Sequence, residues 1–374
     1  MKPKTPKLFA AGTVSVLFAA TSLFLCCAES DDIPAADADV ESELLEGLDP
    51  SYFLEDGLVS AIEEVDCTLS DGTESRCYKI EITGAPSDHQ VGPFCPRTIT
   101  DGADAVGIWL ESGVVHDITG EWITNLAEFY NDDNWQLYDE ASGLVRVTDT
   151  EEACEAAARP DVAEEYQNHC VECSMDYVGG GVTKELLIPA NPKAGASASE
   201  IGGTESVGVA LNGVAFDPPA PVDAILGAYT IAAFDDCGGH VNLVAGYHYH
   251  AATGCSESIS QDDNHAALMG YALDGYAIHT MAGEDGIEPD DLDSCRGHVD
   301  SVRGYHYHSA SAGENMFIGC FRGLTVEGVG GDLPGGPGGG DVIVCEDVAD
   351  GSPCCGDAVC DGPETAANCA ADCA

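Results

Sequence analysis

Short stretches in which hydrophobic and polar positions alternate occur along the chain and predict β-strands. Residues 76–83 (RCYKIEIT) and 107–110 (GIWL) have this two-residue period. Helical patterns are fewer. Residues 150–159 (TEEACEAAAR) predict a helix that Thr150 caps and the following proline ends, and a second helix is expected over 161–169. The pattern therefore favours a β-rich α+β fold.

The first residues have the pattern of an export signal. A basic start is followed by an uncharged apolar stretch over 8–25, which predicts a signal peptide at 1–27. The stretch ends in Leu-Phe-Leu-Cys-Cys and loosely resembles a bacterial lipobox, with Cys27 as the lipidated residue. Cleavage after Ala28 and an uncleaved membrane anchor are the alternatives. We expect an exported protein, either a lipoprotein of the cell surface, outer membrane or periplasm, or a secreted protein.

Segments of biased composition divide the rest of the chain. Residues 28–50 are acidic and rich in alanine and predict a solvated tether, 194–204 predict a loop, and the glycine-rich residues 328–341 predict a flexible linker. The remaining segments are a mixed α/β region at 58–193, a β domain at 203–324 and a small disulfide-rich module at 345–374.

The cysteine content indicates an oxidising compartment. The chain has 18 cysteines, too many for a reducing cytosol, and both the central block and the C-terminal block hold an even number. The candidate local disulfides are Cys67–Cys77, Cys170–Cys173, Cys237–Cys255 and Cys295–Cys320. The Cys-x-x-Cys at 170–173 could also be a redox or zinc motif, but we favour structural disulfides for both of its cysteines.

Charge excludes one large class of partners. The chain has 66 acidic residues against 13 Lys and Arg, and a formal net charge of -53. Such a chain repels phosphate backbones and anionic membranes, so we expect no nucleic-acid partner and no membrane contact except through an N-terminal lipid. Its hydrophobic content of 44% is that of a folded protein. Cations remain as partners.

An internal duplication is the most informative feature. Residues 235–250 (DDCGGHVNLVAGYHYH) align without a gap to 293–308 (DSCRGHVDSVRGYHYH). Upstream of each copy lie 210–216 (ALNGVAF) and 272–278 (ALDGYAI), in which Asn-Gly or Asp-Gly between apolar residues signals a hairpin. Each copy therefore predicts a tight hairpin, a loop and a Cys-Gly-His hairpin, and together they predict a pseudo-twofold β domain over 203–324.

Six histidines fall within the duplicated hairpins. Residues i and i+2 of a strand share a face, so His248 and His250 are expected on one face, and Tyr247 and Tyr249 on the other. If the hairpin brings His240 beside the pair, three imidazoles converge, and the second copy repeats the set. The candidate metal ligands are His240, His248, His250, His298, His306 and His308.

Three imidazoles with an open position suit copper or zinc, and copper is slightly preferred because it has the higher affinity for such sites. Asp235 and Asp293 could orient a ring or act as ligands themselves, and Tyr247 and Tyr305 could donate supporting hydrogen bonds. One shared two-metal site and two separate sites are both compatible with the sequence, as is a purely structural role for the histidines.

The paired Gly-Tyr-His-Tyr-His blocks resemble the YHYH-domain family of exported bacterial proteins. Residues 67–79, 92–96 and 318–323 add to this resemblance, which covers about 67–323. It implies no established reaction. His279 departs from the family, where an aromatic residue is usual, so His279 and the nearby His265 are weaker site candidates.

The leading hypothesis is an exported protein that binds or handles copper or zinc through its two histidine-rich repeats. A metal-dependent hydrolase or oxidase using the same histidines, and a non-catalytic structural or interaction protein, are the alternatives. Nucleophilic catalysis is disfavoured, because the sequence has no Gly-x-Ser-x-Gly elbow and its cysteines are expected to be oxidised. Whether the protein is an enzyme stays open.

The C-terminal module could hold a second kind of cation. It resembles the short Cys-Gly-Asp-x-x-Cys elements that end many exported myxobacterial proteins, and disulfides must hold so small a unit. Its carboxylates could bind calcium, although their spacing is not that of an EF-hand. The candidates are Asp357, Asp361, Glu364 and Asp372.

Overall fold

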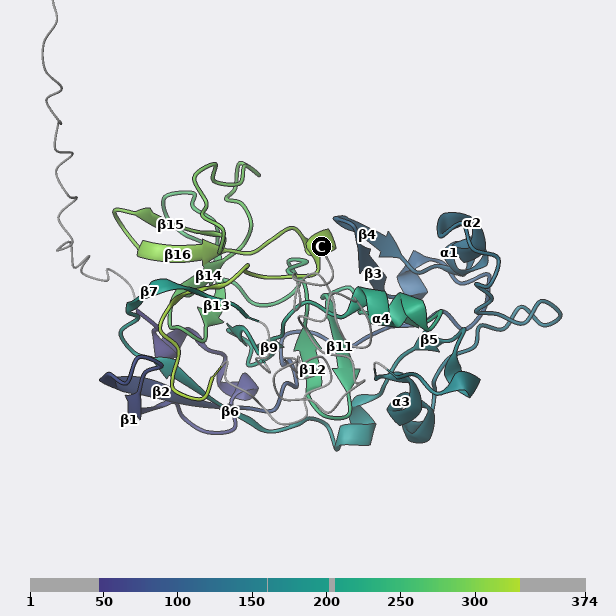
Figure 1. Ribbon diagram of the computed structural model, residues 1–374, viewed down its shortest axis with the longest axis horizontal. Coiled ribbons are helices and arrows are strands. Elements are labelled where there is room, and N and C mark those ends of the chain that lie inside the picture. Colours follow the sequence, from purple (N-terminus) through teal and green to yellow (C-terminus); the bar gives the residue numbers. More distant parts are fainter. Residues whose placement is uncertain (1–46, 160, 202–205, 330–374) are drawn as a thin grey trace, which may run out of the picture. The chain divides into compact units, whose positions relative to one another are not determined.

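The computed structural model describes residues 47–159, 161–201 and 206–329 (Figure 1). The expected signal peptide, Cys27, most of the tether and of the glycine-rich linker, and the whole C-terminal module with its calcium candidates lie outside the described residues. Within the described ranges, no helix combines the length and the apolar character that a membrane span requires.

Strands dominate the described part of the chain, which contains few and short helices. The strands are β1 Glu63–Thr68, β2 Glu74–Ile82, β3 Ile108–Glu111, β4 Val114–Asp117, β5 Cys170–Val171, β6 Lys184–Pro189, β7 Ala194–Ser199, β8 Gly208–Ala210, β9 Ala215–Phe216, β10 Ile231–Ala232, β11 Gly239–Asn242, β12 Gly246–Tyr249, β13 Leu268–Ala272, β14 Ala277–His279, β15 Gly297–Asp300, β16 Gly304–His308 and β17 Phe321–Gly323. The α-helices are α1 Gly120–Thr124, α2 Leu126–Phe129, α3 Glu151–Ala157 and α4 Val222–Gly227. The 3-10 turns are η1 Pro50–Tyr52, η2 Glu55–Gly57, η3 Ala103–Ala105, η4 Glu164–Tyr166, η5 Met175–Val178 and η6 Ala312–Glu314.

An eight-stranded sheet carries the duplicated segments, in the order β11-β12-β9-β8-β13-β14-β16-β15 (Figure 1). The hairpins β8–β9, β13–β14, β11–β12 and β15–β16 are antiparallel, whereas β12 runs parallel to β9 and β16 runs parallel to β14. The expected tight hairpins and Cys-Gly-His hairpins are therefore present in both copies.

The two Cys-Gly-His hairpins share one register. His240 pairs with His248 in the first, and His298 pairs with His306 in the second. Each second strand begins at a glycine with positive φ, 72° at Gly246 and 68° at Gly304, a conformation that glycine adopts without strain. The same turn chemistry therefore places equivalent histidines across both hairpins.

Smaller sheets surround this one: β1-β2-β6, β3-β4, β5-β10 and β7-β17. The predicted strands at 76–83 and 107–110 correspond to β2 and β3. The predicted helix at 150–159 is α3, and the Thr150 hydroxyl accepts a hydrogen bond from the Ala153 N–H at 3.2 Å, as an N-cap does.

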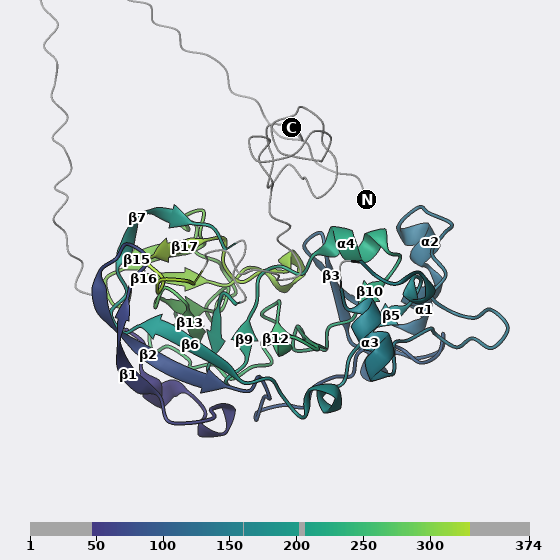
Figure 2. The ribbon, with the colours of Figure 1, turned by 60° about the horizontal axis from the view of Figure 1, so that its bottom comes forward.

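Two sequence-based assignments are wrong. Residues 194–199 form β7, which pairs with β17 (Figure 2), although a loop was expected over 194–204. This strand is mostly exposed, so backbone pairing forms it and its hydrophobic pattern gives no signal. The helix predicted over 161–169 is absent, and these residues contain only the short turn η4. The chain becomes extended just after them, because Cys170 begins β5 and pairs with β10.

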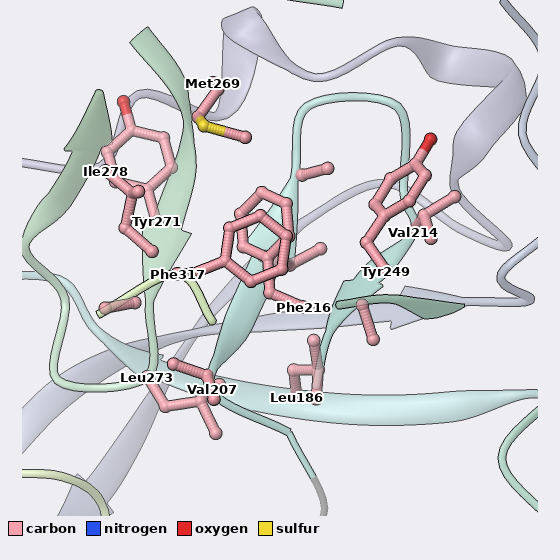
Figure 3. Packing of buried hydrophobic residues seen from close by; sticks show 14 of the residues in the cluster. Leu186, Val207, Val214, Phe216, Tyr249, Met269, Tyr271, Leu273, Ile278 and Phe317 are labelled. Atoms are coloured by element: carbon pink, nitrogen blue, oxygen red, sulfur yellow. The ribbon is translucent and has the colours of Figure 1, made fainter. Parts of the chain in front are cut away.

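Buried aromatic and aliphatic side chains pack against the central sheet (Figure 3). The rings of Phe216 and Phe317 lie 4.2 Å apart, between centroids, beside Tyr249. The same cluster includes Ile80 of β2 and Ile188 of β6. The core therefore contains residues from both of the predicted segments, 58–193 and 203–324.

Five disulfides join described residues: Cys67–Cys77, Cys95–Cys170, Cys154–Cys173, Cys237–Cys255 and Cys295–Cys320. Three of the expected local pairs form, and Cys170–Cys173 does not. Extended chain separates the Cα atoms of residues i and i+3 by about 10 Å, too far for a disulfide. The two cysteines instead enter different hydrophobic clusters, each with its own partner.

Candidate metal centres

The first histidine cluster consists of His240 on β11, His248 on β12 and His250 just after β12. The Nε2 atoms of His240 and His248 lie 3.1 Å apart, and the His250 ring centroid lies 4.8 Å and 5.0 Å from those of His248 and His240. One ring nitrogen of each histidine lies within 4.8 Å of the others. The hairpin thus brings together the three imidazoles that the sequence singled out.

Backbone carbonyls fix the tautomer of two of these rings. His248 Nδ1 lies 3.0 Å from the Gly246 oxygen, and His250 Nδ1 lies 2.6 Å from the Pro218 oxygen. A carbonyl oxygen only accepts, so each Nδ1 carries the hydrogen and the neutral ring keeps its lone pair on Nε2. Burial lowers the pKa of all three rings, so they are neutral at pH 7.

A buried carboxylate and a buried amine adjoin the first cluster. Asp217 Oδ2 lies 3.7 Å from His248 Nε2, and its Oδ1 lies 3.8 Å from Lys184 Nζ and accepts a 2.8 Å hydrogen bond from Ser206. Burial raises the pKa of Asp217, against the opposing effects of Lys184 and His250. Asp217 and Lys184 were not predicted as site residues, because both lie outside the Cys-Gly-His hairpin motif that pointed to the histidines.

The second histidine cluster consists of His298 on β15, His306 and His308 on β16, and His265 from the loop before β13. His306 Nε2 lies 3.0 Å from both His298 Nε2 and His265 Nε2. One ring nitrogen of each of the four histidines lies within 4.8 Å of the others. This cluster therefore contains the three expected imidazoles and a fourth, His265, which ranked only as a weak candidate.

Every Nδ1 in the second cluster faces an acceptor. His306 Nδ1 bonds to the Gly304 oxygen at 3.0 Å and His308 Nδ1 to the Thr280 oxygen at 3.0 Å. His265 Nδ1 bonds to a backbone oxygen at 3.0 Å, and His298 Nδ1 donates to the Asp291 carboxylate at 2.7 Å. Each Nδ1 hydrogen is therefore directed to an acceptor, and a ring that is neutral in this tautomer keeps its lone pair on Nε2.

Burial favours the neutral form of three of these rings, those of His265, His306 and His308. It lowers the pKa of His306 to about 4 and that of His308 to about 3, and it also lowers the pKa of His265. Within the described part of the chain, His308 Nε2 is buried and has no hydrogen-bond partner. A buried ring nitrogen with a lone pair and no donor is ready to act as a ligand.

His279 on β14 adds a fifth imidazole beside the second cluster. Its ring centroid lies 4.7 Å from that of His265 and 5.0 Å from that of His306, and its Nδ1 bonds to the Ala266 oxygen at 2.8 Å. It is paired in register with His308. The second cluster is therefore richer in imidazole than the first.

Residues 185–289 match the family model described as YHYH protein. The chain contains a YHYH domain. The match includes the first cluster, His265 and His279, and it confirms over these residues the resemblance expected from the sequence. The comparisons with curated proteins and with solved structures found no match for the chain.

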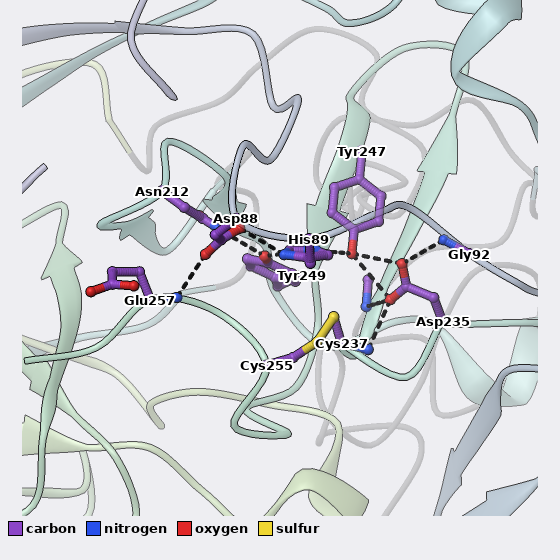
Figure 4. The surroundings of a disulfide bond; sticks show 11 residues. Asp88, His89, Gly92, Asn212, Asp235, Cys237, Tyr247, Tyr249, Cys255 and Glu257 are labelled. Carbon is purple, nitrogen blue, oxygen red and sulfur yellow. Dashed lines mark hydrogen bonds and ion pairs between the residues drawn. A yellow bond between two sulfur atoms is a disulfide. The ribbon is translucent and has the colours of Figure 1, made fainter. Parts of the chain in front are cut away.

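The tyrosines of the YHYH strands occupy the face opposite the histidines. Asp235 accepts hydrogen bonds from the Tyr247 hydroxyl at 2.8 Å and from the Gly92 N–H at 3.0 Å (Figure 4). Asp293 accepts one from the Tyr305 hydroxyl at 3.0 Å. The interpretation of Asp235 and Asp293 as ring-orienting partners or ligands is therefore corrected: their carboxylates hold tyrosines and loop N–H groups.

A third group of ligand types lies on this tyrosine face. His89 Nε2 is 3.4 Å from the hydroxyls of both Tyr247 and Tyr249, and the ring adjoins Cys237 and Cys255 (Figure 4). The two cysteines are joined in a disulfide and offer no thiolate. In this oxidation state the group is a polar network around a disulfide, whereas the two histidine clusters present free nitrogen donors.

Proposed function

We propose that the protein binds transition-metal ions, copper or zinc, at its two histidine clusters. The second cluster supplies the observation that carries the proposal: His265, His298 and His306 bring three Nε2 atoms to 3.0 Å contacts, while their Nδ1 hydrogens point at other acceptors. Lone pairs at this distance repel one another unless a cation lies between them. Burial lowers the pKa values of His265 and His306, so these two rings carry no second proton that could fill that role at pH 7.

The spacing also suits coordination. With metal–nitrogen bonds of about 2.0–2.1 Å, tetrahedral ligands are about 3.4 Å apart and square-planar neighbours about 2.9 Å apart. The observed separations of 3.0 Å and 3.1 Å fall between these values. Only small adjustments of the rings would therefore be needed to bind an ion in either cluster.

A structural role accounts for the histidines less well. A histidine that serves only to satisfy the backbone would have both nitrogens bonded to backbone or side-chain groups. Here the backbone satisfies Nδ1 alone in His248, His250, His306 and His308, and the other nitrogens converge.

We propose a pseudo-twofold domain over 203–324 with two separate metal sites. The sheet order supports this, since the pairings β12-β9-β8 and β16-β14-β13 have the same directions and the two halves meet at the β8–β13 pair. Five strand spacings separate β12 from β16, or about 24 Å along the sheet at about 4.8 Å each. That distance is too long for a shared two-metal centre.

Binding or storage is favoured over catalysis, and a location outside the cytoplasm is favoured by the five disulfides. His248 is 2% exposed, His250 6% and His306 1%. A catalytic metal needs an open position that a substrate can reach, and ligands buried to this degree leave little access.

Elemental analysis of protein exported to an oxidising compartment tests the proposal. We expect one ion per cluster in the wild type, loss of one ion in His248→Ala and loss of the other in His306→Ala. His169→Ala, which alters a histidine outside both clusters, serves as the control and retains both ions. Metal-free wild-type protein after exposure to copper and zinc would refute the proposal, and loss of all metal from either single variant would refute separate sites.

A further inference from the structure

One matched position differs between the two halves of the sheet. Residues 210–216 and 272–278 are equivalent in sequence, so the next residues, Asp217 and His279, are equivalent as well. The strand pairing agrees, because Phe216 pairs with Tyr249 as Ile278 pairs with Tyr307. Each of the two residues therefore enters its own cluster from the same place in the fold.

The first cluster consequently has three imidazoles with a carboxylate at its edge. Asp217 Oδ2 is 3.7 Å from His248 Nε2, which places the carboxylate at the edge of the cluster. The ammonium group of Lys184 lies 3.8 Å from the same carboxylate and, among the described residues, has no hydrogen-bond partner. A fixed positive charge beside the first cluster opposes the binding of a further cation, and Asp217 offsets it.

The second cluster has four imidazoles, with the imidazole of His279 beside it, and charged side chains lie outside them. One of these, Asp300, pairs with Arg303 at 2.6 Å. His279 replaces the carboxylate, and His265 has no counterpart in the first cluster. The Asp291 carboxylate accepts from His298 Nδ1 at 2.7 Å, and Asp300 Oδ2 lies 4.0 Å from His265 Nε2. A carboxylate bonded to the far nitrogen of a ring makes that ring a stronger donor.

Building on the proposed metal binding, we infer that the two clusters take different ions. Copper(II) fills the second cluster first, the first cluster is a zinc site, and the residue pair Asp217 and His279 sets much of the difference. Copper(II) favours several imidazoles in a tetragonal arrangement, whereas three imidazoles and one carboxylate oxygen suit tetrahedral zinc. Each cluster has a positive charge near it, Lys184 beside the first and Arg303 beside the second, and each cation adjoins a carboxylate. The donor sets, rather than the nearby charges, therefore distinguish the two clusters.

A competition experiment on single-site proteins tests the inference. His306→Ala leaves the first cluster, and His248→Ala leaves the second. Each metal-free protein is mixed with equal amounts of copper(II) and zinc(II), desalted and analysed for bound metal. The copper-to-zinc ratio is expected to be higher in His248→Ala by roughly tenfold or more, the scale on which changes around a metal site alter affinity.

Exchange of the matched residues tests the cause. Asp217→His, made in the His306→Ala protein, is expected to raise the copper-to-zinc ratio at the first cluster. His279→Asp, made in the His248→Ala protein, is expected to lower it at the second. Asp217→Asn is the matched control, because it removes the carboxylate without adding an imidazole and is expected to weaken binding without raising the ratio.

A measurement on unaltered protein covers the case in which a buried substitution prevents folding. Wild-type protein with less than one equivalent of copper(II) is expected to show nitrogen hyperfine structure of four imidazole ligands in its electron paramagnetic resonance spectrum. A spectrum of three nitrogens and an oxygen, or equal copper-to-zinc ratios in the two single-site proteins, overturns the inference while leaving metal binding intact. Wild-type protein that binds neither ion overturns the proposed function instead.

Discussion

Asp274 carries a buried charge whose removal should stabilise the protein at neutral pH. Its side chain is 0% exposed and accepts hydrogen bonds from the Tyr307 hydroxyl at 2.5 Å and the Gly323 N–H at 2.8 Å. Burial raises the pKa of this carboxyl to about 6, because the hydrogen bonds offset only part of the cost of desolvation. The equivalent residue of the first half is Asn212, which donates to the Tyr249 hydroxyl at 2.8 Å.

The size of the effect follows from linkage. In the unfolded chain the carboxyl ionises near 3.8, and in the folded protein near 6. The protonated group therefore contributes stability at pH values below about 4, and this contribution is lost as the pH rises to 6. Above pH 6 the difference is worth about 3 kcal/mol. Asp274→Asn removes the charge and keeps an oxygen that accepts from Tyr307 and Gly323. Hydrogen bonds to an amide oxygen are weaker than those to a carboxylate, which reduces the gain by about 1 kcal/mol. We therefore expect the free energy of unfolding to rise by about 2 kcal/mol at pH 7.5.

Urea unfolding at pH 4.5 and pH 7.5, with the disulfides intact and a chelator present, measures this effect. At pH 4.5 the protonated carboxyl and the amide have similar donors and acceptors, so the two proteins should have similar stability. The reciprocal Asn212→Asp is the matched control. It places a carboxyl beside Asp88, whose oxygen is 3.0 Å from Asn212 Nδ2, and should destabilise more at pH 7.5 than at pH 4.5. A loss of stability in Asp274→Asn that is equal at both pH values would refute the reasoning.

Three further predictions concern the metal-free protein. The lowered pKa of His306, about 4, means that only the unfolded chain takes up a proton between about pH 6.5 and 4, which should cost about 2 kcal/mol of stability at pH 5. His306→Gln should shrink the difference in urea stability between pH 7.5 and 5, and an unchanged difference contradicts the prediction. Replacing Cys95 and Cys170 together by Ser removes a disulfide with a sequence separation of 75 and should lower the free energy of unfolding by about 4 kcal/mol. A loss below about 1 kcal/mol would show that this disulfide does not stabilise the fold as expected. Ile278→Ala, at a 0% exposed position, should lower the free energy of unfolding in urea by about 2–5 kcal/mol. Leu144→Ala, at a 55% exposed position, is the control, and an equal loss in both variants would contradict the core position of Ile278.

The histidine clusters were predictable where they depend on local geometry. The alternation of tyrosine and histidine fixes which residues share a face, and the hairpin brings His240 opposite His248 and His298 opposite His306. The tight hairpins and three of the disulfides likewise join residues that are close together in the chain. Bringing such residues into contact costs little loop-closure entropy.

The rest of each site comes from distant segments that no local pattern marks. His265 reaches the second cluster from a loop, and Lys184 reaches the first from β6, which pairs with β2 in another sheet. Cys95–Cys170 closes a large loop in the same way. Such contacts depend on how the sheets pack against one another, which strand periodicity does not encode.

The alternation of tyrosine and histidine also explains how the YHYH strands keep their register. A strand that is buried on both faces usually has apolar side chains, which can slip by one residue pair with little penalty. Here the tyrosine face needs acceptors for its hydroxyls, supplied by Asp235 for Tyr247 and by Asp274 for Tyr307, whereas the histidine face needs backbone carbonyls for each Nδ1. A slip of one residue would place hydroxyls in the histidine cluster and imidazoles among carboxylates. Buried polar groups would then be unpaired on both faces, at a cost of about 1–3 kcal/mol each. The acceptors on the tyrosine face are therefore as necessary to the histidine clusters as the hairpin turns, although none of these acceptors faces a cluster.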